Sequence, residues 1–283
     1  MTRIGDLLAA GRSLSFEFFP PKTDDGVRAL QLVLDELATF DPTFVSVTYG
    51  AGGTTTERTR GIVLDINRTR PFPAMPHLTC VSHTKAEVVE LLQDYRAHGI
   101  DNVLALAGDP PADGSPTAGE FRYAYELVEL VREQGDFSIG VAAFPEVHPR
   151  SVDRATDRRH LAAKLEAADF AITQFFYDVE DYVRMMDELA ALGVTKPVIP
   201  GVFPPANPSA VRRFAAVNAS RTPDDVLERI EKASPEEGRA IAADVAIELS
   251  QRLLEVGAPG IHIYAMNRAD VPGAVARAIK PLL

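Results

Sequence analysis

Short runs of β-branched and aromatic residues alternate with longer amphipathic stretches about eight times, and this alternation most restricts what the chain can fold into. Repeated strand-then-helix units are typical of a parallel sheet with helices packed around it. The runs that favour strands are residues 14–19, 43–48, 76–80, 102–106, 137–142, 170–175, 198–202 and 260–264. The stretches that favour helices are residues 24–39, 55–68, 85–98, 121–133, 153–167, 179–192, a long region over 208–256 and a last helix near 271–279.

Local signals support these boundaries. Thr84 and Asp178 are residue types that begin helices, and Gly99 and Gly193 are suited to the left-handed position that ends them. Residues 109–117, which contain three prolines, read as one exposed loop, and no linker rich in proline, glycine and serine divides the chain. At 283 residues the length suits one large barrel, so the sequence predicts an α/β fold, a single (βα)8 TIM barrel over residues 1–283, rather than an open doubly wound sheet.

Composition excludes several classes of function. The 46% share of apolar residues supplies a large core, and the net charge of −11 repels phosphate backbones and anionic lipid surfaces, so nucleic acid and membranes are not expected partners. Cys80 is the single cysteine, no His/Cys cluster has zinc-ligand spacing, and neither a leader peptide nor a long apolar span is present. We therefore expect a cytoplasmic protein without a metal, and a barrel without an added regulatory domain because the chain ends soon after the eighth unit.

Polar residues gather where the predicted strands end. In a (βα)8 barrel the carboxyl ends of the strands meet at one face, which carries the active site. The residues at these ends are Glu17, Thr48, Tyr49, His77, Thr79, Asp109, Glu146, His148, Gln174, Tyr264, Asn267 and Arg268. No nucleophile elbow, P-loop or G-x-G-x-x-G turn is present, and the glycine-rich residues 50–53 fit either a tight turn or a phosphate site.

Glu17 stands out because it interrupts the aromatic run at residues 15–21. If Phe16, Phe18 and Phe19 desolvate it, its pKa rises and it keeps a proton near neutral pH, as a general acid must. The alternative is a structural carboxylate paired with a lysine or arginine at the end of the strand. The run alone leaves both interpretations open.

Eight short motifs, in order, carry a family resemblance. They are residues 15–21, 44–51, 76–80, 106–110, 142–149, 172–176, 199–202 and 264–268. Together they resemble the 5,10-methylenetetrahydrofolate reductases over nearly the whole chain. The resemblance implies a (βα)8 barrel that reduces methylenetetrahydrofolate to 5-methyltetrahydrofolate with electrons from NADH or NADPH, usually through bound FAD.

The resemblance also implies roles for residues on the substrate side. Glu17 matches the general acid, which would protonate N10 of the folate and open the imidazolidine ring to a 5-iminium cation that accepts hydride. Asp109 matches the acid that contacts the pterin and stabilises the cation. Gln174, Tyr264 and Arg268 match substrate-contacting positions, and Phe214 matches an aromatic residue that stacks on folate or nicotinamide in turn.

The cofactor side departs from the family pattern. The positions that match flavin contacts are Thr48, Tyr49, His77, Gly108, His148, Asp157 and Lys164. Ala107 stands where the family usually has arginine, and Phe144 stands where it commonly has tyrosine. His160 and Ala163 replace an asparagine and an arginine of one bacterial pattern, and the turn at residues 167–169 is one residue shorter.

Two missing guanidinium groups would remove charge-assisted hydrogen bonds worth roughly 1.5–3 kcal/mol each, which weakens FAD about 100-fold or more. We therefore expect a flavin-poor or flavin-independent variant in which NADH delivers hydride directly to the folate iminium. One alternative is a conventional FAD enzyme in which Arg150, Arg158 or Arg159 compensates. Another is a non-catalytic folate-binding barrel, against which the presence of both Glu17 and Asp109 argues, because simple binding would not require a poised acid.

Overall fold

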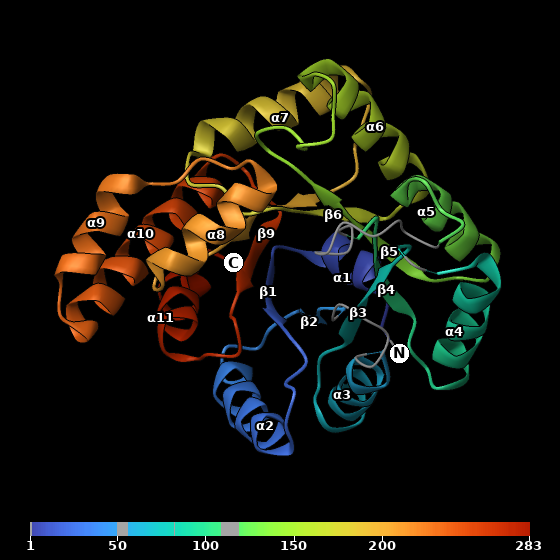
Figure 1. Cartoon of the computed structure of the whole chain (residues 1–283), viewed down its shortest axis with the longest axis horizontal. Helices are drawn as coiled ribbons and strands as arrows, with labels where there is room; N and C mark the ends of the chain where they lie inside the picture. Colours follow the sequence, from blue (N-terminus) through green and yellow to red (C-terminus); the bar gives the residue numbers. More distant parts are fainter. Residues whose placement is uncertain (1, 50–55, 82, 109–118) are drawn as a thin grey trace.

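A computed structural model describes residues 2–49, 56–81, 83–108 and 119–283 of the chain. In this part a nine-stranded sheet, parallel in every pairing, runs in the order β7-β6-β5-β4-β3-β2-β1-β9-β8 (Figure 1). The strands are β1 (Ser13–Phe18), β2 (Phe44–Val47), β3 (Ala74–Thr79), β4 (Asn102–Leu106), β5 (Ser138–Ala143), β6 (Phe170–Thr173), β7 (Val198–Ile199), β8 (Gly201–Val202) and β9 (Gly260–Tyr264).

The sheet closes on itself at Pro200. This residue separates β7, which pairs with β6, from β8, which pairs with β9. Proline has no N–H to donate to a ladder, but its carbonyl still accepts the N–H of His262 at 3.0 Å. The predicted strand 198–202 is therefore two halves of one barrel position, so the nine strands fill eight positions. The predicted (βα)8 barrel is confirmed.

Helices surround the barrel between the strands (Figure 1). Seven match the predicted stretches: α2 (Asp24–Ala38), α3 (Thr56–Thr69), α4 (Lys85–Ala97), α5 (Ala124–Glu133), α6 (Arg154–Ala167), α7 (Val179–Ala191) and α11 (Asp270–Ile279). The long region over 208–256 is three helices: α8 (Pro208–Asn218), α9 (Asp224–Lys232) and α10 (Pro235–Glu255). Among the described residues, none of the helices has both the length and the apolar character needed to cross a membrane.

The predicted helix signals are present in the structure. Thr84 forms a capping box with Glu87 at the start of α4, and the Asp178 carboxylate accepts the Glu180 N–H at the start of α7. After α4 and α7, Gly99 and Gly193 have φ values of 71° and 80°, which is the left-handed conformation that ends a helix.

Strand residues alternate between two apolar layers. Outward-facing side chains, such as Phe16 and Phe18 of β1, pack with Leu30, Leu34 and Leu37 of α2 in the main core between barrel and helices. A second, smaller cluster fills the barrel interior, and it consists of Ile4, Leu8, Phe44, Met75, Leu104, Phe170, Ile172 and Ile199. The two layers hold the strands in one register and so fix which side chains point into the barrel.

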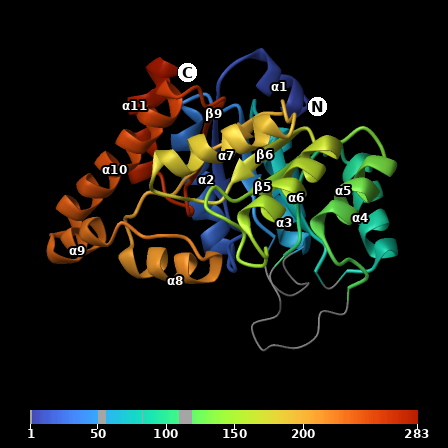
Figure 2. The ribbon, with the colours of Figure 1, turned by 90° about the horizontal axis from the view of Figure 1, so that it is seen from above.

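An N-terminal helix, α1 (Ile4–Ala10), closes the amino end of the barrel, and it was not predicted from the sequence. Its first N–H groups are satisfied by strand side chains: the Ile4 N–H donates to Asn102 Oδ1 at 2.7 Å, and the Gly5 N–H donates to Ser138 Oγ at 2.9 Å. Figure 2 places α1 and α8 at opposite ends of the barrel. With the amino end plugged, polar side chains inside the barrel have access to solvent at the carboxyl end.

Replacing Asn102 with alanine should destabilise the protein by about 1–3 kcal/mol, because the buried Ile4 N–H then has no acceptor. Urea unfolding of the Asn102→Ala variant measures this loss. The control is Asn218→Ala at the end of α8, where the side chain makes no hydrogen bond in the described part of the chain and the change should stay within about 0.5 kcal/mol. Equal effects of the two substitutions would contradict this account of α1.

Candidate active site at the carboxyl end of the barrel

Glu17 lies on the inner face of β1, near its carboxyl end, with its side chain 15% exposed. Its neighbours Phe16 and Phe18 point to the opposite face, because successive residues of a strand alternate, and Phe19 is 40% exposed. The prediction that these three phenylalanines desolvate Glu17 is therefore wrong. The groups that surround the carboxylate come from other strands.

Three polar side chains surround one oxygen of Glu17. His77 Nε2 of β3 lies 3.2 Å from Oε2, His262 Nε2 of β9 lies 3.4 Å from it, and the Ser46 hydroxyl of β2 donates to it at 3.3 Å. Burial raises the pKa of Glu17, but the charge of His77 and the hydrogen bonds and charges of both imidazoles lower it further, to about 2.

The predicted rise in the pKa of Glu17 is thus wrong in direction, because strands far apart in the sequence bring two imidazoles to the carboxylate. The alternative of a lysine or arginine partner is also wrong for the described residues, none of which contacts Glu17 with such a side chain. Glu17 is an ionised carboxylate in a polar cluster at the mouth of the barrel.

His262 is the residue of this cluster that sequence reasoning missed. It is fully buried, its Nδ1 lies 2.8 Å from Ser15 Oγ, and its ring stacks on Phe44 with centroids 6.0 Å apart. The signal was present in the alternation of β9: if Tyr264 faces the barrel interior, so does the residue two positions earlier. The β-prone run at residues 260–264 by itself predicts only a strand.

Tyr264 lies above His262 in the same cluster, with the two rings edge to face at 5.4 Å. Its hydroxyl donates to the Thr173 carbonyl at 2.7 Å, and burial and the charge of Glu17 raise its pKa well above the ordinary value. Tyr264 therefore joins β9 to β6 as a neutral side chain, and its ring is one wall of the mouth.

The other predicted substrate positions lie around this mouth at different depths. Half-buried Phe214 of α8 packs against Phe203, with centroids 5.9 Å apart, in an aromatic cluster that includes Tyr264. Gln174 directly follows β6, and its Oε1 accepts the Phe175 N–H at 2.9 Å. Arg268 is 63% exposed and paired with Asp270 at 2.6 Å, so the structure does not bring it to Glu17.

Two further strand-end residues have structural partners. Asn267 accepts the Phe19 N–H at 3.0 Å and donates to the Phe19 carbonyl at 2.8 Å, which joins the chain after β9 to the chain after β1. Glu146 accepts hydrogen bonds from Arg221. Asp109, predicted to stabilise the cation, lies outside the described residues, as do residues 50–53.

The first group of predicted cofactor positions follows β2, β3 and β4. The Thr48 N–H donates to the Phe18 carbonyl at 2.8 Å, and the Tyr49 hydroxyl lies 2.9 Å from His83 Nε2. Ala107 accepts the Cys80 thiol at 3.2 Å, and Gly108 has a φ of 81° with no room for a Cβ, which would lie 2.8 Å from the side chain of Val81. Gly108 thus allows the backbone to turn directly above β4.

The second group surrounds the loop between β5 and α6. The rings of Phe144 and His148 meet edge to face at 4.5 Å. The buried Asp157 carboxylate accepts the His148 N–H at 3.3 Å and the Ser151 hydroxyl at 2.9 Å. Lys164 donates to the Ala142 carbonyl at 2.7 Å, and burial lowers its pKa to about 8 although the charge of Asp157 opposes the shift. The predicted positions of this group are therefore close together.

Comparison with known proteins identifies the family. The sequence model for "Methylenetetrahydrofolate reductase" matches residues 3–280. The chain belongs to the methylenetetrahydrofolate reductase family. It is 38% identical over 266 residues to the 5,10-methylenetetrahydrofolate reductase of Pectobacterium carotovorum subsp. carotovorum, which covers 93% of this chain and 88% of the relative.

Two further matches extend the comparison. A relative in Arabidopsis thaliana named methylenetetrahydrofolate reductase (NADH) 1 is 34% identical over 272 residues, which is 90% of this chain and 46% of that protein. A Clostridium thermocellum protein that binds two copies of 5-methyl-5,6,7,8-tetrahydrofolic acid has a TM-score of 0.71, with 14% identity and coverage of 99% of this chain and 100% of that one. This last likeness shows the shared barrel fold.

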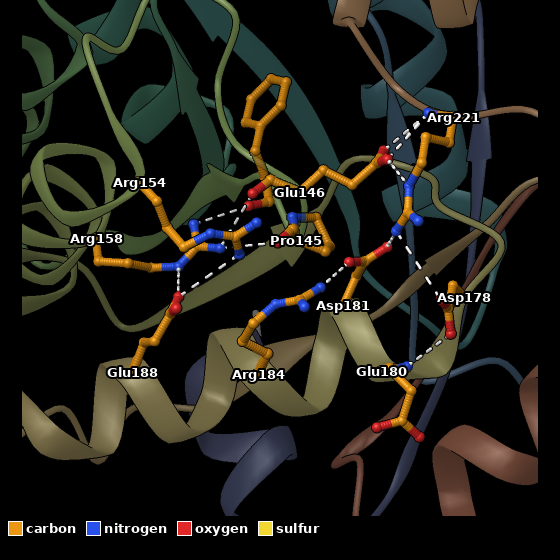
Figure 3. Close-up of polar contacts among 11 residues, drawn as sticks. Pro145, Glu146, Arg154, Arg158, Asp178, Glu180, Asp181, Arg184, Glu188 and Arg221 are labelled. Atoms are coloured by element: carbon orange, nitrogen blue, oxygen red, sulfur yellow. Dashed lines mark hydrogen bonds and ion pairs between the residues drawn. The ribbon is translucent and has the colours of Figure 1, made fainter.

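Arg158, which could compensate for a missing cofactor contact, instead binds the loop between β5 and α6. Arg158 is 2% exposed and donates to the Phe144 carbonyl at 3.0 Å, the Pro145 carbonyl at 2.8 Å and Glu188 of α7 at 2.7 Å (Figure 3). Its neighbour Arg159 is exposed and donates to Thr156 Oγ1. The guanidinium of Arg158 is therefore occupied by the protein.

Arg221 fixes the same loop from the other side. Its backbone N–H and its guanidinium both donate to Glu146, at 3.0 and 2.9 Å from Oε1, and the guanidinium also contacts Asp181 of α7 (Figure 3). The segment between α8 and α9 is thereby tied to the β5–α6 loop. Together, Arg158 and Arg221 hold the loop that carries Phe144 and His148 by contacts within the protein.

Among the described residues, no three or more histidine, cysteine, aspartate or glutamate side chains converge in a way that would hold a metal ion.

Replacing Arg158 with methionine should destabilise the protein by about 3–5 kcal/mol, because Asp157 and the loop carbonyls lose a buried cationic donor. The matched control is Arg159→Met at the next position, which removes an exposed arginine and should change stability by about 0.5 kcal/mol or less. Urea unfolding of both variants measures the difference. Comparable losses would show that Arg158 is not a structural tie.

Proposed function

We propose that this protein reduces 5,10-methylenetetrahydrofolate to 5-methyltetrahydrofolate with NADH or NADPH as the electron donor. The observation that carries the proposal is the Glu17 cluster, a carboxylate at the mouth of the barrel with imidazoles from β3 and β9 within 3.4 Å, in a member of this reductase family. The Clostridium thermocellum barrel, which binds a methylated tetrahydrofolate, supports a folate ligand. The name of the Arabidopsis relative supports NADH as the donor.

In the proposed reaction, Glu17 donates a proton to N10 of the substrate. The bond between N10 and the bridging carbon breaks, its electron pair stays on N10, and the 5-iminium cation accepts hydride at that carbon. The half-buried ring of Phe214, which has the Arg213 guanidinium 4.9 Å from its centroid, is proposed to stack on a flat ligand ring. The amide nitrogen of Gln174, whose oxygen is occupied, is a donor for the pterin. Tyr264 and Arg268 are proposed substrate contacts, and Asp109 is proposed to stabilise the cation.

The residues present fit FAD poorly, and we propose that hydride passes directly from NADH to the iminium. Ala107 and Ala163 offer no guanidinium to the cofactor phosphates, and Arg158, one of the three arginines that could compensate in an FAD enzyme, is buried against loop carbonyls. Each missing charge-assisted hydrogen bond costs roughly 1.5–3 kcal/mol of affinity. The second candidate is a conventional FAD enzyme, which Lys164, His148 and Asp157, close together around the β5–α6 loop, favour.

Replacing Glu17 with glutamine should lower kcat by about 10²–10⁴-fold, because the amide cannot protonate N10. Methylenetetrahydrofolate binding should change only a few-fold, since the side chain keeps its shape. NADH oxidation and equilibrium folate binding are measured together, with Glu255→Gln at the exposed end of α10 as the control. Turnover of Glu17→Gln at the wild-type rate would exclude Glu17 as the acid. If the wild-type protein binds folate but does not oxidise NADH, it is a non-catalytic folate-binding barrel.

Flavin-stripped protein should oxidise NADH with methylenetetrahydrofolate at the same rate with and without added FAD. The double variant Ala107→Arg/Ala163→Arg should bind FAD about 100-fold more tightly than the wild type, because it restores two phosphate donors. Flavin fluorescence titration measures this, with Ala216→Arg on the exposed face of α8 as the control. Oxidation that occurs only when FAD is restored would decide for the conventional flavoenzyme.

A further inference from the structure

The contacts of Glu17 are one-sided. Ser46, His77 and His262 all approach Oε2, whereas no side chain of the described residues forms a hydrogen bond with Oε1. The two oxygens of this carboxylate are therefore not equivalent: one is enclosed by the barrel, and the other is left for a ligand in the mouth.

The two imidazoles contact Oε2 in different ways. His262 Nε2 is in hydrogen-bonding geometry with Oε2 at 3.4 Å. His77 Nε2 is closer, at 3.2 Å, but its N–H does not point along a hydrogen bond to any partner in the described part of the chain. The charge of His77 is the largest of the causes that lower the pKa of Glu17, and His262 is the imidazole whose Nε2 meets the hydrogen-bond geometry at Oε2.

His262 is fixed from behind by Ser15. The two residues are direct partners in the parallel pairing of β1 with β9, two residues before the pairing of Glu17 with Tyr264. Ser15 Oγ lies 2.8 Å from Nδ1, and both side chains are fully buried. Ser15, His262 and Glu17 thus form a continuous line that leads from inside the barrel to its mouth.

A hydroxyl is the partner that keeps Nε2–H directed at Glu17 in both states of the ring. When the ring is neutral, Ser15 O–H donates to bare Nδ1; when the ring is protonated, Ser15 Oγ accepts from Nδ1–H. An ionised carboxylate can only accept, so Nε2 carries the hydrogen in each case. Both ring nitrogens therefore have a partner in either state. A buried ring nitrogen without a partner would cost about 1–3 kcal/mol.

The other groups that face Glu17 do not take this role. Tyr264 from β9 has a raised pKa and already donates its proton to the Thr173 carbonyl. The Ser46 hydroxyl from β2 is a neutral donor, and in the described residues no lysine or arginine contacts the carboxylate. His77 from β3 lies 3.2 Å from Oε2, but its Nε2 is not in hydrogen-bonding geometry with any described residue.

We propose that His262, held by Ser15, is a positioning residue that keeps an N–H on Oε2 of Glu17, so that the proton for N10 is carried on Oε1. The role of His262 in turnover rests on the proposed function, but its contact with Glu17 is independent of that function. In the proposed step the Oε1–H bond breaks as the N10–H bond forms, and the carboxylate left behind keeps its hydrogen bond from His262. The low pKa of Glu17 supports the geometry, since His262 is one of its causes.

The first test measures the carboxyl pKa of Glu17 without substrate, by ¹³C NMR of glutamate-labelled protein with Glu17→Gln used for assignment. The wild-type carboxyl should show no titration over roughly pH 4–8, because its pKa is about 2. In His262→Phe, which keeps a ring against Phe44 but cannot donate, the pKa of Glu17 should rise measurably above the wild-type value, because burial still raises it while only His77 remains to lower it. Ser15→Ala should shift it in the same direction by a smaller amount.

Ser13→Ala is the matched control. Ser13 lies two residues before Ser15 on the same face of β1, is equally buried, and its hydroxyl has no hydrogen-bond partner among the described residues. Its removal should leave the pKa of Glu17 unchanged. A Glu17 pKa that stays near 2 in His262→Phe, or that shifts as much in Ser13→Ala as in Ser15→Ala, would overturn the proposal.

The second test follows turnover as a function of pH. His262→Phe should lower kcat about 10- to 100-fold, less than loss of the acid itself, with a KM for folate within a few-fold of wild type and a displaced kcat–pH profile. His262→Gln, whose amide N–H can reach Oε2, should recover part of kcat. An unchanged pH profile in both variants would overturn the positioning role. If wild-type protein shows no turnover, the proposed function fails, and the NMR result still decides whether His262 governs Glu17.

Discussion

The pairing of β1 with strands on both sides is the interaction on which the site depends. Backbone hydrogen bonds to β2 and β9 place Glu17 directly opposite Ser46 on one side and Tyr264 on the other. Because side chains alternate along a strand, a slip of one residue would turn Glu17 into the apolar layer beneath the helices and bring Phe16 or Phe18 into the barrel. The burial of these two phenylalanines against α2 is therefore what keeps a carboxylate pointing into the mouth.

Sequence patterns predicted the elements whose signals are local. The strand at residues 102–106 and the strand at residues 260–264 have the predicted bounds, and the start of α4 at Thr84 follows from its capping box. Helix α1 escaped prediction because it is seven residues long and its N-terminus is satisfied by Asn102 and Ser138, far along the chain. A short helix whose caps come from the tertiary structure leaves little trace in its own residues.

The electrostatics of the site also depend on residues far apart in the sequence. The motif that contains Glu17 located the residue, but the direction of its pKa shift depends on His77 and on His262, which is 245 positions away. The sequence also does not show whether an arginine is free to bind a ligand. Arg158 and Arg159 are adjacent in the sequence, yet one is sealed against Phe144 and Pro145 and the other faces solvent. A residue type in a motif predicts what chemistry is present, and only the fold decides what that group already binds.

Burial raises the pKa of Glu17 and the imidazole contacts lower it. A ligand in the mouth would change the burial and leave the imidazole contacts in place. Ser15 and His262 lie beneath the carboxylate, inside the barrel, where a molecule in the mouth does not reach them. In the proposed reaction the substrate covers Glu17 from the open side, removes water from Oε1, and so increases the desolvation that raises the pKa. In that reaction, Glu17 would be ionised in the free protein and would carry a proton more readily when the base that it must protonate is beside it. In the proposed reaction, Glu17 would therefore stay ionised until the substrate adds to its burial.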